Sequence, residues 1–234
     1  MATPETLPEA ALHFDLHSGT VRELNRRLHE EAPAGRVLVA NPGGRHAIAA
    51  GLDADCEVEI AGHVGYYCAG MNKRATVRVR GNCGVGVAEN MMSGTVIVEG
   101  SASQAAGATA RGGLLVIHGD ASARCGISLK GADIVVRGSV GHMSAFMAQT
   151  GNLVVCGDAG EALGDSLYEA RLYIRGLVRS LGADCIEKEM RDEHRIQLAG
   201  LLEGAGIDGD VDGFRRYGSA RQLYTFKVDN VGAY

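Results

Sequence analysis

The segment HFDLH near the start of the chain places His13, Asp15 and His17 at alternate positions. Alternate residues of an extended strand point to the same face, and two imidazoles with a carboxylate are a ligand set that transition metals accept. No further cluster of ligands marks the sequence, so we favour an ordinary strand at the end of the fold. A metal pair stays open as the alternative.

The six cysteines could supply nucleophiles or metal ligands, but they are widely spread and none belongs to a Cys-x-x-Cys pair. This spacing indicates neither a zinc site nor an iron–sulfur cluster. Cys68 and Cys125 occupy equivalent positions of a sequence repeat, and that position elsewhere holds Val87, Ala106 and Leu163. Since Val and Leu are typical of interior positions, we predict reduced, buried thiols. The six residues are Cys56, Cys68, Cys83, Cys125, Cys156 and Cys185.

Two other segments bear only a superficial likeness to a phosphate-binding loop and to an acid/base pair. The glycine-rich GNCGVG of residues 81–86 lacks the GxGxxG spacing of a phosphate-binding loop, and no helix is predicted after it. Asp158, Glu161 and Asp165 could form an acid/base pair, but no matching group stands at a suitable position. Nucleophile-elbow, zinc-protease and P-loop motifs are absent from the sequence. The sequence therefore predicts no catalytic, cofactor-binding or metal-binding residue in this chain.

A repeat of 19 residues dominates the middle of the sequence. Phrases such as VRVR, VIVE and LVIH precede the repeated glycine, and their alternation predicts strands with one buried face. Seven positions after each glycine stands only Ala or Gly, which indicates an inward corner with no room for a larger side chain. The repeated glycines are Gly62, Gly81, Gly100, Gly119, Gly138, Gly157 and Gly176. The small residues are Ala69, Ala88, Gly107, Gly126, Ala145, Gly164 and Ala183.

This period fits one turn of a three-sided β-solenoid with about six residues on each side. We predict a mainly β fold: a right-handed, single-stranded parallel β-helix of about seven 19-residue coils, with α-helical N- and C-terminal flanks. Seven coils would form a rod ~30–35 Å long. The predicted divisions are an N-terminal segment with a capping helix (1–36), the β-helix (37–182), and a C-terminal helix with an aromatic, basic tail (183–234).

Both flanks carry helix signals. Thr20 and Glu23 have the spacing of a capping box, and apolar residues follow at helical intervals. Near the other end, residues 185–204 are predicted to form a helix whose apolar face begins with Ile186 and Met190 and which ends at Gly204.

The tail beyond that helix is rich in aromatic and Arg residues, the types enriched in protein interfaces. We therefore expect it to be a contact surface of this chain or of a complex. Its candidate interface residues are Phe214, Arg215, Arg216, Tyr217, Tyr224 and Phe226.

Composition excludes several classes of function. The 34 glycines come with only four prolines and 46% hydrophobic residues, which argues for a packed protein rather than a flexible linker. A net charge of −5 without a basic run argues against nucleic-acid binding. No apolar stretch approaches the ~18 residues that a membrane span needs, and the N-terminus lacks a signal-peptide pattern. We expect no membrane partner and a cytoplasmic location.

Residues 37–182 resemble the GXGXG family, the β-helix found at the C-terminal end of the glutamate synthase large subunit and as a separate subunit of formylmethanofuran dehydrogenase. The resemblance rests on the repeated V-x-V-x-G phrases, the small-residue corner, and stretches such as GYYCAGMNKRATVRVRG. The flanking stretches FDLHSGTVRELNRRLHEE and RRYGSARQLYTF resemble the stand-alone glutamate synthase-like subunits of N-methylglutamate synthases.

This resemblance implies a structural subunit of a complex that makes N-methylglutamate from glutamate and methylamine. The implied partners are a glutamine-amidotransferase-like subunit and an FMN-containing glutamate synthase-like subunit. FMN, with an iron–sulfur cluster as a further candidate, would belong to a partner, and this chain would have no active site of its own. Two alternatives remain: the β-helical scaffold subunit of formylmethanofuran dehydrogenase, and an independent β-solenoid enzyme.

Overall fold

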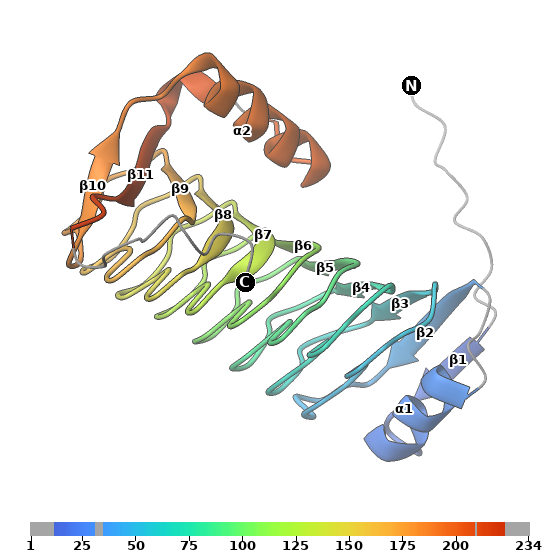
Figure 1. The fold of residues 1–234 in the computed structure, drawn as a ribbon. Helices are drawn as coiled ribbons and strands as arrows, with labels where there is room; N and C mark the ends of the chain where they lie inside the picture. The colour runs from blue at the N-terminus through green and yellow to red at the C-terminus, as the bar shows by residue number, and fades with distance from the viewer. Residues whose placement is uncertain (1–11, 31–34, 209, 223–234) are drawn as a thin grey trace, which may run out of the picture.

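The computed structural model describes residues 12–30, 35–208 and 210–222, and Figure 1 shows them as a rod of stacked coils. The fold is mainly β, a parallel β-solenoid of about seven turns, which confirms the predicted class. One 11-stranded sheet runs along the rod in the order β1-β2-β3-β4-β5-β6-β7-β8-β9-β11-β10. The strands are β1 (Leu12–Asp15), β2 (Arg36–Ala40), β3 (Glu57–Ile60), β4 (Thr76–Val79), β5 (Thr95–Val98), β6 (Leu114–Ile117), β7 (Lys130–Val136), β8 (Thr150–Val155), β9 (Arg171–Ile174), β10 (Cys185–Lys188) and β11 (Arg215–Ser219). The helices are α1 (Val21–Glu30) and α2 (Asp192–Gly204), with a 3-10 turn at Val211–Gly213.

The sequence repeat sets the register of the sheet. Val77 of β4 pairs with Val96 of β5, and Val96 pairs with Leu115 of β6. All three side chains are fully buried, because alternate residues of each strand face the inside of the coil. The same repeat position therefore supplies the same row of the core in successive coils.

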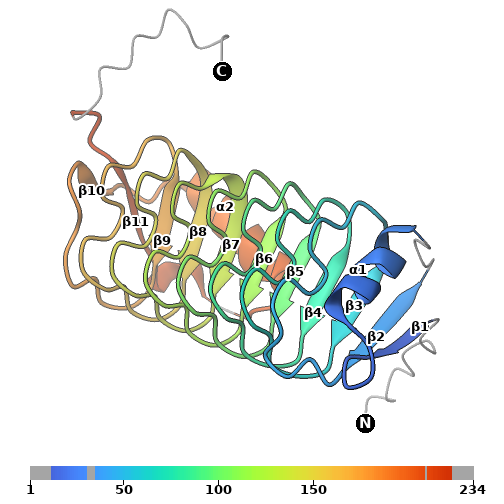
Figure 2. The same ribbon diagram turned by 90° about the horizontal axis from the view of Figure 1, so that it is seen from below.

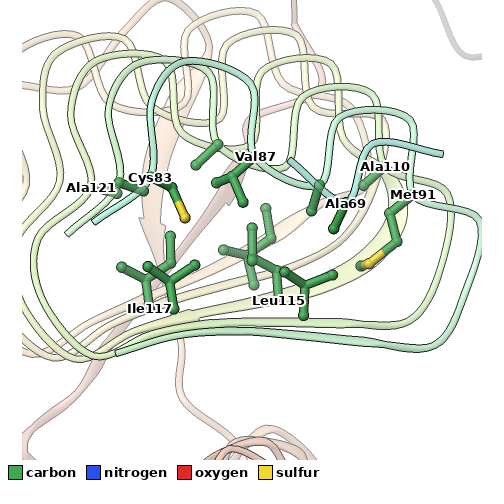
Figure 3. Packing of buried hydrophobic residues seen from close by; sticks show 14 of the residues in the cluster. Ala69, Cys83, Val87, Met91, Ala110, Leu115, Ile117 and Ala121 are labelled. Atoms are coloured by element: carbon green, nitrogen blue, oxygen red, sulfur yellow. The ribbon is translucent and has the colours of Figure 1, made fainter. Parts of the chain in front are cut away.

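Each coil has a second wall that faces its strand. Cys83 and Ala121 lie opposite Leu115 and Ile117 in Figure 3, so that aliphatic and thiol side chains from the two walls fill the interior. The second wall contacts neighbouring coils through isolated bridges such as Cys83 with Ala102. The period suggested three equal sides for each coil, and the structure does not form them. Each repeat contributes one strand, one bridging residue, and turns.

The turns of each coil contain left-handed residues at alternate positions. In one coil Tyr67, Ala69 and Met71 have φ values of 59°, 53° and 57°. Ala69 is buried, and a Cβ on the equivalent Gly107 would lie 2.5 Å from the Cδ1 atom of Ile134. Since the large residues Tyr67 and Met71 adopt the same left-handed conformation, it is the lack of space that requires a small residue at this corner.

The last coil departs from the period. Leu163 bridges Leu181, which lies 18 residues further on, and the N–H of Gly182 donates to the carbonyl of Leu163. Ala183, which the sequence pattern places in the small-residue column, is exposed. Gly182 takes that position instead, because one residue is missing from the last turn.

Helix α1 covers the first coil. The hydroxyl of Thr20 accepts a hydrogen bond from the N–H of Glu23 at 3.1 Å, as the capping pattern predicts. Asn25 donates to the carbonyl of Ala47 and accepts from the N–H of Ala49, so one amide side chain satisfies two backbone groups of the terminal coil. Leu24 on the same helix is buried in the main core.

Helix α2 packs on the outer face of the sheet, and Figures 1 and 2 show it alongside β6 to β8. Leu198 and Leu202 form a second hydrophobic cluster with Val116, Val135 and other outward-facing sheet residues. The predicted helix over residues 185–204 is wrong in its first part. Residues 185–188 form β10 instead, because this segment pairs with β11. Ile186 is 41% exposed on that strand, and Met190 precedes the helix.

The outer face of the preceding strands carries charges instead of a helix. Glu59 of β3 pairs with Arg36 of β2 and with Arg80, which follows β4, and Arg80 also approaches Glu99 after β5. Acidic and basic residues thus alternate from coil to coil. The rod has one outer half that is covered by α2 and another that presents a charged surface.

Candidate functional site

The repeat glycines let neighbouring coils approach closely. The N–H of Gly138 donates to the carbonyl of Gly119 at 3.0 Å, and the N–H of Gly157 donates to Gly138 at 2.9 Å. A Cβ on Gly157 would lie 2.7 Å from the carbonyl carbon and oxygen of Gly138, closer than real Cβ contacts. Gly62 differs, because its neighbour is the Pro42 ring and its φ is +147°. The glycine positions therefore stack the backbone and leave no space for a bound group.

A ladder of polar side chains follows this glycine stack, which sequence reasoning missed. The residue after each repeat glycine except Gly176, which Leu177 follows, accepts a hydrogen bond from a backbone N–H of the next coil. Asp120 accepts from Ser139 at 2.7 Å, Ser139 accepts from Asp158 at 3.0 Å, and Asp158 accepts from Leu177 at 2.8 Å. The shared types (Asn, Ser, Asp) at one column could have revealed it, since these residues often bond to nearby backbone.

The acidic cluster considered as an acid/base pair is used structurally. Asp158 belongs to the ladder, and Asp165 accepts hydrogen bonds from the hydroxyl of Ser166 at 2.6 Å and the N–H of Ala183 at 3.2 Å. Glu161 is exposed. Two of the three carboxylates therefore have backbone or neighbouring side-chain partners, and the arrangement supplies no matched acid and base.

The HFDLH segment forms β1 and the turn after it. His13 and Asp15 are exposed on one face while Phe14 is buried on the other, as the alternation predicts. Asp15 accepts hydrogen bonds from the side-chain amide of Asn41 at 2.8 Å and from the backbone N–H of His17 at 2.7 Å. Both lower the pKa of Asp15, and the hydrogen bond from Asn41 is the larger cause. Within the described residues, no group of three His, Cys, Asp or Glu side chains could hold a metal ion.

All six cysteines are free and buried, as predicted. Burial raises the pKa values of Cys83, Cys125 and Cys185 to about 12, because a thiolate inside the core would lose its hydration. The thiol of Cys68 is shifted in the same direction. Ser144, which shares the interior column of Cys125, bonds its hydroxyl to the carbonyl of Gly141. The thiols are therefore protonated core residues rather than nucleophiles.

The tail residues behave differently from one another. Phe214 is buried with α2 in the outer cluster, and Tyr217 is buried in the main core. These two side chains pack inside this chain, so they are not available to a partner. For Arg215 and Arg216, which are partly accessible on β11, the interface role stays a prediction. Tyr224 and Phe226 lie outside the described residues.

A cavity of about 320 Å³ lies where α2 begins, and it was not foreseen from the sequence. It gathers side chains from β9, β10 and β11 and from the segment that enters the helix. Its basic lining residues are Arg171, Lys188, Arg191, Arg216 and Arg221. Since these residues are spread over about 50 positions of sequence, no local motif could have grouped them.

The fold and these contacts define a β-solenoid protein in which the six thiols are buried in the core and Asp158 and Asp165, among the described residues, form structural hydrogen bonds. In the described part, the helices are also too short or too polar to cross a membrane.

No protein-family model matches the chain. The chain is 62% identical over 225 residues to Protein GlxC of Rhizobium meliloti (strain 1021), and the alignment covers 94% of this chain and 99% of the relative. The chain belongs to the GlxC family.

Proposed function

We propose that this chain is the non-catalytic structural subunit of a glutamate synthase-like, FMN-dependent complex that makes N-methylglutamate from glutamate and methylamine. It positions an amidotransferase-like subunit and a flavin-containing synthase-like subunit, and it helps to enclose the route of ammonia or amine between them. FMN, and an iron–sulfur cluster where one is present, belong to the partner. The complex works in the cytoplasm.

The observation that carries this proposal is the continuous stack of coils with a filled interior. Backbone hydrogen bonds join each coil to the next along the rod, and the core is occupied by Val, Leu, Ile, Ala and Cys side chains. Such a body fixes the distance between two points on its surface. Transfer of a reactive amine between two active sites depends on fixed geometry and on exclusion of water, which a rigid spacer can provide.

The side-chain chemistry supports a role without catalysis by this chain. The carboxylates of Asp120 and Asp158 bond to backbone, and the buried thiols hold their protons well above neutral pH. The similarity to Protein GlxC spans nearly the whole of that relative, so the relative is not a larger synthase chain with this fold as one part. Both points favour a separate subunit that works through partners.

The proposal can be tested by changing the length of the rod. A duplication of residues 57–94 would add two coils and keep the alternation of Glu59, Arg78, Arg80 and Glu99 on the outer face. It would separate the two ends by about 10 Å more, at ~4.8 Å per strand. In the reconstituted complex we expect the partial reactions of each partner to persist while the overall synthesis falls and free ammonia or amine escapes.

The control for this experiment is the complex with the unaltered chain, assayed for the same partial reactions. Cooperative unfolding of the lengthened chain would show that it folds. If the lengthened chain assembles and couples the partial reactions as efficiently as the unaltered chain, the spacer role is wrong.

A second experiment identifies the partners. Affinity capture of the full chain, co-produced with the candidate subunits, should give a yellow complex that contains both, whereas the chain alone should be colourless and inactive. Turnover of glutamate with methylamine by the isolated chain would contradict a structural role. Capture with a pterin- or tungsten-containing protein would instead support the formylmethanofuran dehydrogenase alternative.

A further inference from the structure

The cavity at the start of α2 has an unusual charge for this protein. Five basic side chains line it against two acidic ones, Glu169 and Glu193, although the whole chain carries a net charge of −5. Glu169 pairs with Arg221 at 2.9 Å, and Arg191 pairs with Glu189 at 3.0 Å. The cavity therefore concentrates positive charge that the protein's own carboxylates only partly balance.

Three of the cations have no carboxylate partner among the ion pairs of the described residues. Arg171 donates to the side-chain oxygen of Gln197 at 2.8 Å, and Arg216 donates from Nε and Nη2 to the carbonyl of Glu189 at 3.0 and 2.9 Å. These acceptors are neutral, and they orient the two guanidinium groups without cancelling their charge. Lys188 lines the same cavity from β10.

The strand register brings two of these cations face to face. Lys188 and Arg216 are directly paired residues on the antiparallel strands β10 and β11. Like charges at such a pair destabilise a sheet. The stem of Lys188 also passes over Gly218, whose hypothetical Cβ would lie 3.6 Å from the lysine Cγ. The lysine stem therefore lies along the surface of β11.

The surroundings of Arg216 are consistent with an unbalanced field. Its pKa is lowered by desolvation, and the charges of Arg171 and Arg191 add to this effect, while Tyr173 and Glu193 oppose it. His194, which is 6% exposed, also lines the cavity, and its Nδ1 accepts a hydrogen bond from the N–H of Arg191. The cavity lies at the N-terminal, positive end of the 13-residue helix α2.

We propose that this cavity is a binding site for a small oxyanion, a ligand with phosphate or carboxylate groups. Guanidinium groups bind both through paired N–H donors, and a lysine adds a compact charge. The bound anion lies between Lys188, Arg216 and Arg171 and relieves the repulsion between the opposed cations. The volume of the cavity suits a molecule at the small end of the ligand range. This site does not depend on the function proposed above.

Pyrophosphate is a suitable probe for phosphate ligands, and glutarate is a suitable probe for carboxylate ligands. Each should be titrated into the full chain, with NaCl added to keep the ionic strength constant. Calorimetry should show saturable binding of at least one probe, and the same probe should raise Tm beyond the effect of NaCl. Tighter binding of pyrophosphate would assign the site to phosphate ligands, and tighter binding of glutarate to carboxylates.

Lys188→Gln is the central variant, because the lysine is only partly buried and its removal leaves the strand pairing intact. It should weaken probe binding about tenfold or more, the loss expected for one charge-assisted contact, and raise the Tm of the ligand-free chain. Arg216→Gln should weaken binding as well. Lys73→Gln removes a lysine that pairs with Asp53 outside the cavity, and it should leave binding unchanged.

Lack of saturable binding for both probes at millimolar concentrations would overturn the proposal. Binding that Lys188→Gln leaves unchanged would also overturn it, because the anion would then be bound elsewhere on the chain.

Discussion

The N–H of Gly119 donates to the carbonyl of Gly100 at 2.9 Å, and a Cβ on Gly119 would lie 2.8 Å from the Gly100 carbonyl carbon. Gly119→Ala should therefore force the two coils apart or distort them. We expect a loss of about 1–3 kcal/mol in the free energy of unfolding, the usual range for overpacking, measured by chemical denaturation.

A matched control lies in α2. Gly200 is exposed, with no atom within 4 Å of a hypothetical Cβ, so Gly200→Ala should stabilise the chain by about 0.5–1 kcal/mol through helix propensity. Equal effects of the two substitutions would show that stacking does not determine the glycine positions.

The polar ladder predicts that two substitutions of Asp120 differ in their effect on stability. Asp120 accepts from the N–H of Ser139, and its own N–H donates to the hydroxyl of Ser101. Asp120→Ala should cost about 1 kcal/mol of stability, because a backbone donor loses its partner, whereas Asp120→Asn keeps an acceptor and should cost less. Thermal unfolding of both variants measures this. A destabilisation of the same size in both would indicate that the negative charge, not the hydrogen bond, is what matters.

The buried thiols predict how stability depends on alkaline pH. Burial raises the pKa of Cys125 to about 12, so the folded chain holds this proton more tightly than the unfolded chain does. The stabilisation is complete below the ordinary thiol pKa and is lost as pH rises from about 8.5 towards 12, at ~1.4 kcal/mol per pH unit for each such thiol.

Cys125→Ala isolates this contribution. Its free energy of unfolding should fall less steeply above about pH 8.5 than that of the unaltered chain, in urea titrations at several pH values. The thiols of the native chain should also react slowly with alkylating reagents and quickly after unfolding. Parallel pH curves for the two chains would contradict the raised pKa.

Helix α2 is predicted to detach locally when its apolar face is truncated. Leu202 is 2% exposed and packs against the outer face of the sheet, so Leu202→Ala should lower stability by about 2–4 kcal/mol. Hydrogen exchange should increase in α2 before it increases in β3 and β4, which contribute no residue to the cluster under α2. Ile196 on the same helix is 74% exposed, and Ile196→Ala should change stability by less than about 0.5 kcal/mol. Similar losses in both variants would argue against this packing.

The solenoid could be predicted because its signals are local and repeated. Val77 and Val79 alternate within one strand, and their equivalents recur after 19 residues with the same burial. The cap at Thr20 is likewise visible over four residues. Each of these features depends on neighbours in sequence, which a pattern can report.

The remaining features depend on contacts between distant segments. Tyr67 and Met71 adopt left-handed conformations because their N–H groups donate to Val85 and Glu89 of the next coil, and neither residue type signals this. The apolar spacing of Ile186 and Met190 suggested a helix, but pairing with β11 makes residues 185–188 a strand. The cationic cavity joins β9, β10, β11 and α2, so only the folded chain assembles it.

A stack of equivalent turns contains nothing that sets its own length, since each new turn presents the same row of backbone groups to the next. Here the row after β9 is occupied by β11, which runs in the opposite direction and leads outward to β10. A further parallel turn from this chain or from another copy could not continue the ladder beyond β9. The reversed strand thus acts as a terminator, and the number of turns becomes a fixed property of the protein.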